Sequence, residues 1–235
     1  METSLTLYRL QRAELERADC ARKLAQVKTG LQDNSQVDAA AAAAQGKHAT
    51  LTKAQIGVRE LELEAQSLKA KLKSTEERMF SGKVSNPKEL TGLQGENESL
   101  KRRLAKLEDH LLEAMIQLED AEAEHGRAAA ILAATTSQRQ AQVSDLTGEQ
   151  AQLEQRISEL ETAISQTRAS LAAEDMSLYE HMSRRKGGRP VALLIRGNVC
   201  GACGVVVPLA AAQQARDRQA VAFCPSCERV LHSEG

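Results

Sequence analysis

Apolar residues recur every three or four positions along two long stretches of the chain, which is the pattern of a coiled coil. The first stretch contains Leu51, Ala54, Val58, Leu61, Ala65, Leu68, Leu72 and Met79, with Thr75 in the one slot that lacks an apolar side chain. The second contains Leu93, Leu100, Leu104, Leu107, Leu111, Ala114, Leu118 and Ala121, and resumes as Leu146, Leu153, Ile157, Leu160, Ile164 and Leu171. Aromatic residues make up only 2% of the chain, so a large compact core is not expected. The sequence therefore predicts two long helices.

A marked break separates the two helices. The first is expected to end at Ser81-Gly82, and the second begins with Asn86 as N-cap, Pro87 at the first helical position and Glu89 at the third. The turn between them then lies near residues 83–85. A connection this short favours antiparallel neighbours, so the chain is predicted to double back on itself.

A turn at this place pairs residues whose numbers add to about 171. The alanine-rich stretch 39–44 then lies opposite residues 127–132, which read RAAAIL, and Gly46 falls near Gly126. Small residues that meet at one level are expected to let the two backbones approach more closely there.

The first 30 residues carry a weaker apolar seam. Glu14, Arg17 and Lys28 occupy slots that should be apolar, so this segment is expected to fray or to contact a partner. Cys20 stands alone at helical spacing and is interpreted as a small buried apolar residue. The second helix is expected to run to about Met182, and its last turns are expected to pack against the segment that follows.

The composition changes after the second helix. Gly187-Gly188 and Pro190 stop the helix, and the run Val191 to Ile195 predicts a short strand. The fold predicted is mostly α, a long antiparallel two-helix coiled-coil hairpin with a small C-terminal β zinc ribbon. Its predicted parts are a hairpin at 1–183 with its tip at about 81–88, a basic hinge and entering strand at 184–198, and the ribbon at 199–235.

Four cysteines form two Cys-x2-Cys pairs separated by twenty residues, the spacing of a structural four-cysteine zinc site. The predicted ligands of one structural Zn²⁺ are Cys200, Cys203, Cys224 and Cys227. Arg216, Arg218 and Arg229 are available to offset the negative charge of four thiolates. The alternative is two redox-active pairs, but such motifs open a helix in an α/β sheet, and no such unit is predicted.

The metal shell is expected to be closed. Four thiolates complete it, so zinc catalysis is not expected, and His232 is interpreted as a surface residue after the last strand.

Charges nearly cancel, with 31 basic and 32 acidic residues, so the whole chain offers no general attraction for nucleic acid or an anionic membrane. No apolar run reaches the roughly 20 residues of a membrane span, and the first residues lack a signal-peptide core. A cytoplasmic protein is expected.

Two segments carry a resemblance to a known family. MFSGKVSNPKELTGLQGENESLKRRLAKLEDHLLEAM resembles the tip region, and CGACGVVVPLAAAQQARDRQAVAFCPSCERVLH resembles the ribbon, of bacterial C4-type zinc-ribbon proteins with an N-terminal antiparallel coiled-coil hairpin. The resemblance covers nearly the full chain and places the ligands at the four cysteines and the tip at Ser81 to Leu90. It implies a non-enzymatic protein whose relatives bind nucleic acid or act as adaptors and chaperones, in some bacteria for an alternative sigma factor and for flagellar or secretion components. One departure is the ribbon loop Pro208 to Ala215, which is rich in Ala and Gln where relatives are more polar.

The function predicted is that of a non-enzymatic adaptor that links or presents protein partners. Two helices form no pocket for a small-molecule substrate, and no catalytic constellation is visible. Coiled-coil regulators that enter the secondary channel of RNA polymerase need acidic residues at the tip to act near its catalytic metal. The predicted tip here is basic or neutral, which argues against that mechanism and suits docking on a protein groove. The tip residues are Lys83, Val84, Asn86, Pro87 and Lys88.

The alternative is binding of RNA or DNA through the ribbon and the basic hinge, which carries cations with no acid among them. These residues are Arg184, Arg185, Lys186, Arg189 and Arg196. Against this alternative, the chain offers no aromatic platform for stacked bases. The sequence leaves open the partner, the oligomeric state and the role of Cys20.

Overall fold

The computed structural model describes residues 3–82, 85–217 and 221–233. Contacts divide the chain into two units, which we call the central unit, residues 34–142, and the terminal unit, residues 1–33 and 143–235. Helix α3 (Pro87–Ser170) contributes to both units. The predicted ranges 1–183, 184–198 and 199–235 follow changes of composition and stay predictions.

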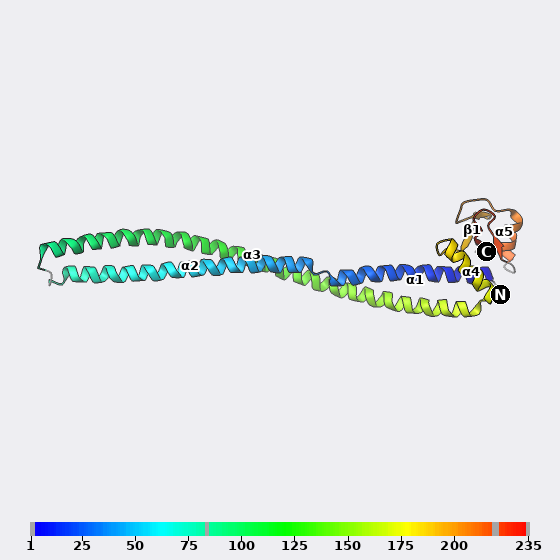
Figure 1. Ribbon diagram of the computed structural model, residues 1–235, viewed down its shortest axis with the longest axis horizontal. Helices are drawn as coiled ribbons and strands as arrows, with labels where there is room; N and C mark the ends of the chain where they lie inside the picture. The colour runs from blue at the N-terminus through cyan, green and yellow to red at the C-terminus, as the bar shows by residue number, and fades with distance from the viewer. Residues whose placement is uncertain (1–2, 83–84, 218–220, 234–235) are drawn as a thin grey trace. The chain divides into compact units, whose positions relative to one another are not determined.

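In the central unit, α2 (Ser35–Phe80) and the first part of α3 lie side by side and antiparallel (Figure 1). Lys47 pairs with Glu124, and Lys69 Nζ lies 2.8 Å from Glu108 Oε1, close to the predicted sum of 171. The seam between the helices holds the residues that the heptads placed there. Those that are buried are Leu51, Val58, Ala65, Leu68, Thr75, Leu93, Leu100, Leu107 and Ala121. Asn97, which the heptads did not include, is buried as well. The antiparallel hairpin is therefore confirmed for this unit.

The helix ends next to the turn also follow the prediction. Helix α2 ends at Phe80 with Ser81 as C-cap, and Gly82 adopts a φ of 70°, which favours glycine. Asn86 caps α3, because its Oδ1 accepts a hydrogen bond of 3.0 Å from the Lys88 N–H. Two predicted tip residues, Lys83 and Val84, lie outside the described residues.

The alanine-rich stretches of the two helices lie opposite one another as predicted, but the glycines beside them do not meet. A Cβ added at Gly46 or Gly126 would meet nothing within 4 Å. At this level the small side chains leave an apolar groove of about 490 Å³, because no bulky side chain fills the space. The groove is lined by Ala41, Ala44, Gln45, His48, His125, Ala129, Leu132 and Ala133.

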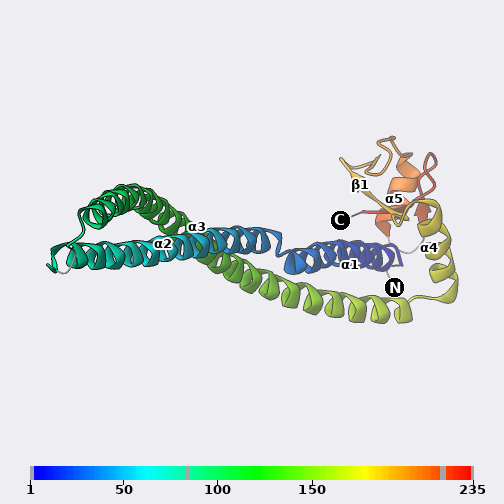
Figure 2. The same cartoon turned by 60° about the vertical axis from the view of Figure 1, so that its left-hand side comes forward.

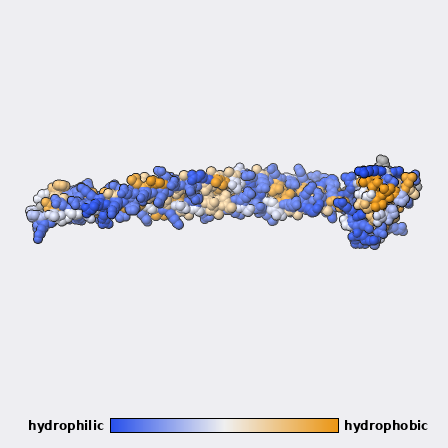
Figure 3. Space-filling view, turned by 90° about the horizontal axis from the view of Figure 1, so that it is seen from above, coloured by the Kyte–Doolittle hydropathy of each residue, from blue (hydrophilic) through white to orange (hydrophobic). Residues whose placement is uncertain are grey.

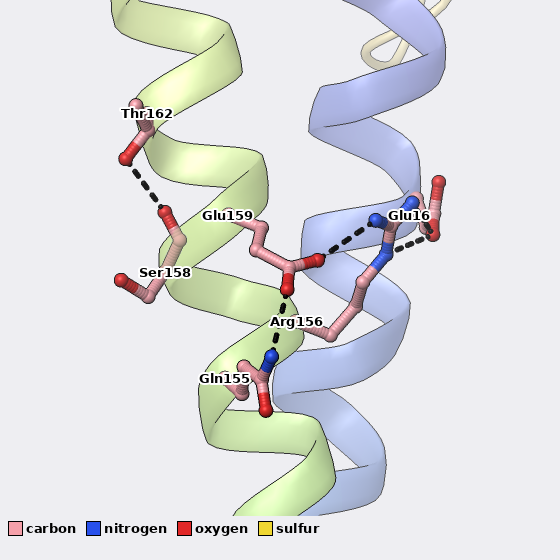
Figure 4. Close-up of polar contacts among 6 residues, drawn as sticks. All are labelled: Glu16, Gln155, Arg156, Ser158, Glu159 and Thr162. Atoms are coloured by element: carbon pink, nitrogen blue, oxygen red, sulfur yellow. Dashed lines mark hydrogen bonds and ion pairs between the residues drawn. The ribbon is translucent and has the colours of Figure 1, made fainter.

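In the terminal unit, α1 (Thr3–Gln32) packs along the last part of α3. The Arg156 guanidinium donates to Glu16 Oε1 from Nε at 2.8 Å and from Nη2 at 2.7 Å, and its Nη1 also pairs with Glu159 (Figure 4). The predicted fraying of this segment is wrong, because Leu7 and Leu10 are fully buried.

The three charged residues in apolar slots of α1 each face an opposite charge on α3. Glu14 pairs with Arg168, Arg17 with Glu161, and Lys28 with Glu154. These ion pairs satisfy the charges at the edge of the seam, which the sequence of α1 alone did not reveal.

Each predicted long helix contains a break. Asp33 and Asn34 separate α1 from α2, and the Asn34 Oδ1 accepts a 3.1 Å hydrogen bond from Arg139 instead of capping α2. Helix α3 ends at Ser170, and α4 (Ala173–Arg185) follows and leads to the sheet (Figure 2). The prediction of one helix to Met182 is therefore wrong, because Leu171 and Ala172 leave the helical conformation. Helix α4 then buries Tyr179 and Met182, and Tyr179 packs with Leu7, Leu10 and Ile164.

The C-terminal module is a four-stranded sheet with one short helix. Its strands are β1 (Val191–Ile195), β2 (Val199–Cys200), β3 (Ala222–Phe223) and β4 (Val230–His232), in the order β2-β1-β4-β3. Strands β1 and β4 are parallel, and the outer two pairings are antiparallel. The predicted strand at Val191–Ile195 is confirmed. The predicted ribbon loop at 208–215 is instead mostly helix α5 (Leu209–Asp217), since its alanines and glutamines favour helix.

The two faces of the sheet pack against different partners. On one face, Ala192, Cys200 and Leu231 form a cluster with Ala215 of α5. The other holds Val191 and Val230 in a cluster with Leu7 and Leu10 of α1, Ile164 of α3 and Tyr179 of α4. The module is thus anchored on the helices of the terminal unit.

The prediction that His232 lies on the surface is wrong. Its side chain is 1% exposed, its ring stacks on Tyr8 with centroids 5.1 Å apart, and its Nδ1 lies 3.2 Å from Ser4 Oγ. The pairing of β4 with β1 directs His232 to the face that α1 covers.

Among the described residues, no helix combines the length and the apolar character that crossing a bilayer requires.

Candidate metal centre

The four cysteines of the module come together at one place. Cys200 ends β2 and Cys203 follows it in a turn, while Cys224 follows β3 and Cys227 closes the next turn. Their Sγ atoms all lie within 4.8 Å of one another, with 3.7 Å between Cys200 and Cys227 and 3.7 Å between Cys203 and Cys224. The structure therefore brings the predicted ligands into one cluster.

The two Cys-x2-Cys turns have the same backbone hydrogen bonds. The Gly204 N–H donates to the Cys200 carbonyl and the Glu228 N–H to the Cys224 carbonyl, each at 2.8 Å. In addition, the Cys200 N–H donates to Val205 O and the Cys224 N–H to Arg229 O, each at 2.9 Å. Each turn thus holds its two sulfur atoms on the same side of the backbone.

Both turns need a residue with positive φ directly after the second cysteine. Gly204 has a φ of 75°, which glycine adopts without strain, but Glu228 has a φ of 61°, which is uncommon for a residue with a Cβ. The conformation at Glu228 is held by its surroundings, because its carboxylate lies 3.2 Å from Arg185 Nη2 and 3.3 Å from Lys186 Nζ.

Gly201 is required for a different reason. A Cβ at this position would lie 2.9 Å from the Leu193 carbonyl oxygen, which already accepts a hydrogen bond from the Gly201 N–H. Glycine therefore lets the first turn sit directly against β1.

The cysteines differ in how readily they ionise. Burial raises the pKa of Cys200 to about 12. Burial also opposes ionisation of Cys227, but the Arg229 N–H, the Arg229 guanidinium and the neighbouring thiols outweigh it and lower the pKa of Cys227 to about 7. Arg229 therefore offsets thiolate charge as predicted.

The other two arginines of that prediction do not share this role among the described contacts. Arg216 Nη2 donates to the Gly197 carbonyl at 2.5 Å, and Arg218 lies outside the described residues.

The cluster fits a tetrahedral metal ion. Zinc–sulfur bonds of about 2.3 Å in a tetrahedron place neighbouring sulfur atoms about 3.8 Å apart, and both short S···S distances here are 3.7 Å. Cys200 and Cys224 are fully buried, Cys227 is half-buried and Cys203 is exposed. The donor set and its spacing match a metal site that is anchored in the core on one side.

The predicted basic residues differ in their surroundings. Arg185 and Lys186 converge on Glu228, beside Cys227, so an acidic residue remote in the sequence neutralises part of the hinge. Arg184 and Arg189 are exposed near the end of α4, and Arg196 is exposed at the turn between β1 and β2, with a φ of 48°.

Near the tip of the central unit, Asn86 caps α3, Pro87 and Lys88 begin its first turn, and the Phe80 side chain is 84% exposed. The described tip residues thus present polar groups and one aromatic ring to solvent.

Sequence reasoning missed the contacts that attach the module to α1. Gln11 Nε2 donates to the Val191 carbonyl at 3.0 Å, and its Oε1 accepts from the Val191 N–H at 2.6 Å. The only signal was a polar residue beside the apolar positions Leu7 and Leu10. Nothing in the local pattern indicated that its partner lies 180 residues away.

Comparisons with known proteins place the chain in a family. Residues 8–187 match the model of the CT398-like coiled coil hairpin domain. The uncharacterized proteins MT2288 and Rv2229c, from two strains of Mycobacterium tuberculosis, are each 32% identical over 162 residues, which cover 65% of this chain. That match spans 62% of the length of these curated relatives.

Two solved structures show the same fold. The structure of CT398 from Chlamydia trachomatis is 16% identical, with a TM-score of 0.58 over 99% of this chain and 94% of that one. A structurally characterised protein from Mycobacterium smegmatis is 22% identical, with a TM-score of 0.53 over 95% of this chain and 97% of that one. Because the family model matches well over half of the residues, this chain belongs to the CT398-like coiled coil hairpin domain family.

Proposed function

We propose that this protein is a non-enzymatic, zinc-binding adaptor of the bacterial cytoplasm that links or presents protein partners, in the manner of a chaperone-like scaffold. The observation that carries the proposal is the four-cysteine cluster, which joins the two turns of a small module whose sheet packs against the helices of the terminal unit. The helices and the module then offer separate surfaces to separate partners.

Zinc is the metal that the donor set favours. Four thiolates in a tetrahedron select soft or borderline ions, and structural sites of this kind hold Zn²⁺. The ion would be held by Cys200, Cys203, Cys224 and Cys227, where it supplies folding energy to short strands that have a small core.

A structural role for the metal supports a function without catalysis. Four protein ligands leave no open position for a substrate or an activated water. The exposed apolar side chains in both units are the kind of surface that protein partners cover.

The second candidate function is binding of RNA or DNA. It is favoured by the exposed side chains of Arg184, Arg189 and Arg196. It is weakened at Arg185 and Lys186, because Glu228 already pairs with both.

The test is recovery of partners by the tagged full-length protein from bacterial lysate, with and without nuclease, followed by rebinding of each purified partner. An adaptor is expected to retain its partners after nuclease treatment and to hold two of them in one complex. The variant Cys224→Ser is expected to lose the partner of the module and to keep the partner of the helices.

The nucleic-acid function predicts a different result. Partners would disappear with nuclease, and the purified protein would shift RNA or DNA with a steep dependence on salt. The triple change Arg184→Ala, Arg185→Ala and Lys186→Ala would then reduce that shift, whereas an adaptor that uses other surfaces would be unaffected.

A further inference from the structure

A row of β-branched side chains lies on one face of the sheet, with its two outer members exposed and Val199 half-buried between them. Ile195 of β1 pairs with Val199 of β2, and Val199 forms a bridge with Val206, so the three side chains lie next to one another on the same face. Ile195 is 44% exposed and Val206 is 64% exposed. Leu209, three residues after Val206, is 63% exposed. Figure 3 shows hydrophobic residues gathered on the surface of the C-terminal module.

This row continues a face that is buried elsewhere in the module. Side chains two and four positions apart on a strand point the same way, so Val191 and Ile195 share a face of β1. Val191 is 3% exposed, in the cluster with Leu7, Leu10 and Tyr179. Helices α1 and α4 therefore cover the beginning of β1 and leave its end, with the row, without cover among the described residues.

The edge of the sheet beside the row is open for hydrogen bonding. The Cys200 N–H donates to Val205 O, and the Val207 N–H donates to Asn198 O. In this type of antiparallel bridge the N–H and C=O of Val206 point away from the sheet. Neither group makes a hydrogen bond in the part of the chain that the structure describes. The edge thus presents one donor and one acceptor flanked by exposed Val205, Val206 and Leu209.

The charged side chains that the structure describes at this edge belong to arginines. Arg196 lies in the turn between β1 and β2, and Arg216 is held at the same turn by its bond to Gly197 O. That turn adjoins the edge, because Asn198 bonds to Val207. The segment from residue 184 to residue 233 contains two acidic residues, Asp217 and Glu228. Glu228 already pairs with Arg185 and Lys186.

We propose that the Val206 edge binds an extended segment of a partner protein as an added strand, with apolar side chains at alternate positions and acidic residues between them. The backbone of the segment pairs with Val206, an apolar side chain packs against Val206 at the outer end of the row, and its carboxylates face Arg196 and Arg216. This inference deepens the proposed adaptor function, on which it rests, by naming the surface and the chemistry of the partner.

Two other occupants fit the surface less well. A nucleic acid would use the arginines but would leave the apolar row and the backbone groups of Val206 without partners. A second copy of the chain, paired edge to edge, would bring its own Arg196 and Arg216 toward the same charges and would be repelled.

The probe is a fluorescein-labelled, capped peptide of sequence EVEVEVE, titrated with the full-length zinc-loaded protein and followed by fluorescence anisotropy. Saturable binding is expected. The peptide KVKVKVK tests the charge, and the acidic peptide with an N-methylated central valine tests the backbone pairing. Both control peptides are expected to bind at least about tenfold more weakly.

Variants locate the site. Val206→Asp places a like charge against the peptide and is expected to weaken binding at least about tenfold, and Arg196→Gln is expected to weaken it less. The matched control is Leu112→Ser, which removes a leucine that is 60% exposed on α3 and is expected to leave binding unchanged. Zinc content and circular dichroism equal to those of the wild type establish that each variant is folded.

Several results would overturn the proposal. They are no binding of EVEVEVE, equal binding of the N-methylated peptide, or equal binding by Val206→Asp. Displacement of the peptide by an RNA oligonucleotide at equal affinity would assign the surface to nucleic acid. A dimer of the wild type that dissociates in the Val206→Asp variant would assign it to a second copy of the chain. If the peptide fails while nuclease-resistant partners are still recovered, the docking inference is wrong and the adaptor function stands.

Discussion

Gln11 joins two parts of the chain that are far apart in the sequence. Its amide satisfies both backbone groups of Val191, at a point where Gln11 is 6% exposed and Val191 is 3% exposed. An amide that is buried without a partner costs about 1 to 3 kcal/mol. The side chain of Gln11 thus extends the hydrogen bonding of β1 to helix α1.

We predict that Gln11→Ala destabilises the terminal unit by about 2 to 3 kcal/mol, because it leaves the N–H and C=O of Val191 unpaired. The measurement is thermal or urea unfolding monitored through the module. The control Gln66→Ala changes an exposed glutamine of α2 and is expected to have little effect. Equal stability of the two variants would show that water replaces the lost contacts.

Tyr179 is a second buried polar residue of the terminal unit. Burial, followed by its hydrogen bond of 2.8 Å to Glu14 Oε2, raises the pKa of its hydroxyl above the ordinary value near 10. The unfolded chain therefore releases this proton at a lower pH than the folded chain does. The stability that Tyr179 contributes is complete below about pH 10 and is lost as the pH rises above it.

We predict that Tyr179→Phe is less stable than the wild type by about 1 kcal/mol at pH 7, and that the difference shrinks above about pH 10. The measurement is the free energy of unfolding between pH 7 and 11. The variant Tyr8→Phe keeps Tyr179 and should keep the alkaline loss. An identical alkaline loss in Tyr179→Phe would refute the assignment.

At the scale of elements, the seam of the central unit contains a polar layer. Thr75 of α2 and Asn97 of α3 are 7% and 6% exposed, and Asn97 hydrogen bonds to Glu76. A buried polar residue in a seam selects one register at some expense in stability. The heptads located the helices, and this layer helps to align them.

The groove at the alanine-rich level is a place where the same seam is underfilled. We predict that Ala129→Leu stabilises the central unit by about 1 kcal/mol, because added methyl groups fill apolar space and leucine keeps the helix propensity of the site high. The measurement is the shift in Tm. Ala70→Leu, at an exposed site of α2 that does not line the groove, is the control, and an equal shift there would point to propensity alone.

At the scale of the molecule, the module depends on its metal and the helices do not. We predict that Cys224→Ser loses stoichiometric zinc and unfolds roughly the last 40 residues, since structural zinc contributes on the order of 10 kcal/mol to such modules. Helical circular dichroism should stay largely intact, because most helical residues lie outside the module.

Zinc content by metal analysis and backbone spectra by NMR measure the two effects. Cys20→Ala is the matched control, because Cys20 is buried in α1 away from the cluster. Retention of one zinc ion per chain by Cys224→Ser would contradict the four-cysteine site.

The sequence by itself determined the parts that depend on neighbours along the chain. Heptad spacing predicts which side chains line the seam, Asn86-Pro87 marks the start of α3, and the cysteine spacing identifies the metal cluster. These features rest on periodicity, capping and ligand chemistry, which act over a few residues.

Only the tertiary structure decided the contacts between distant residues. It placed His232 under Tyr8, paired Glu228 with Arg185 and Lys186, joined Gln11 to Val191, and broke the long helices at Asn34 and Leu171. Each of these depends on which surfaces meet after the chain folds. Local propensity carries no information about these tertiary contacts, because they join residues up to 228 positions apart in the sequence.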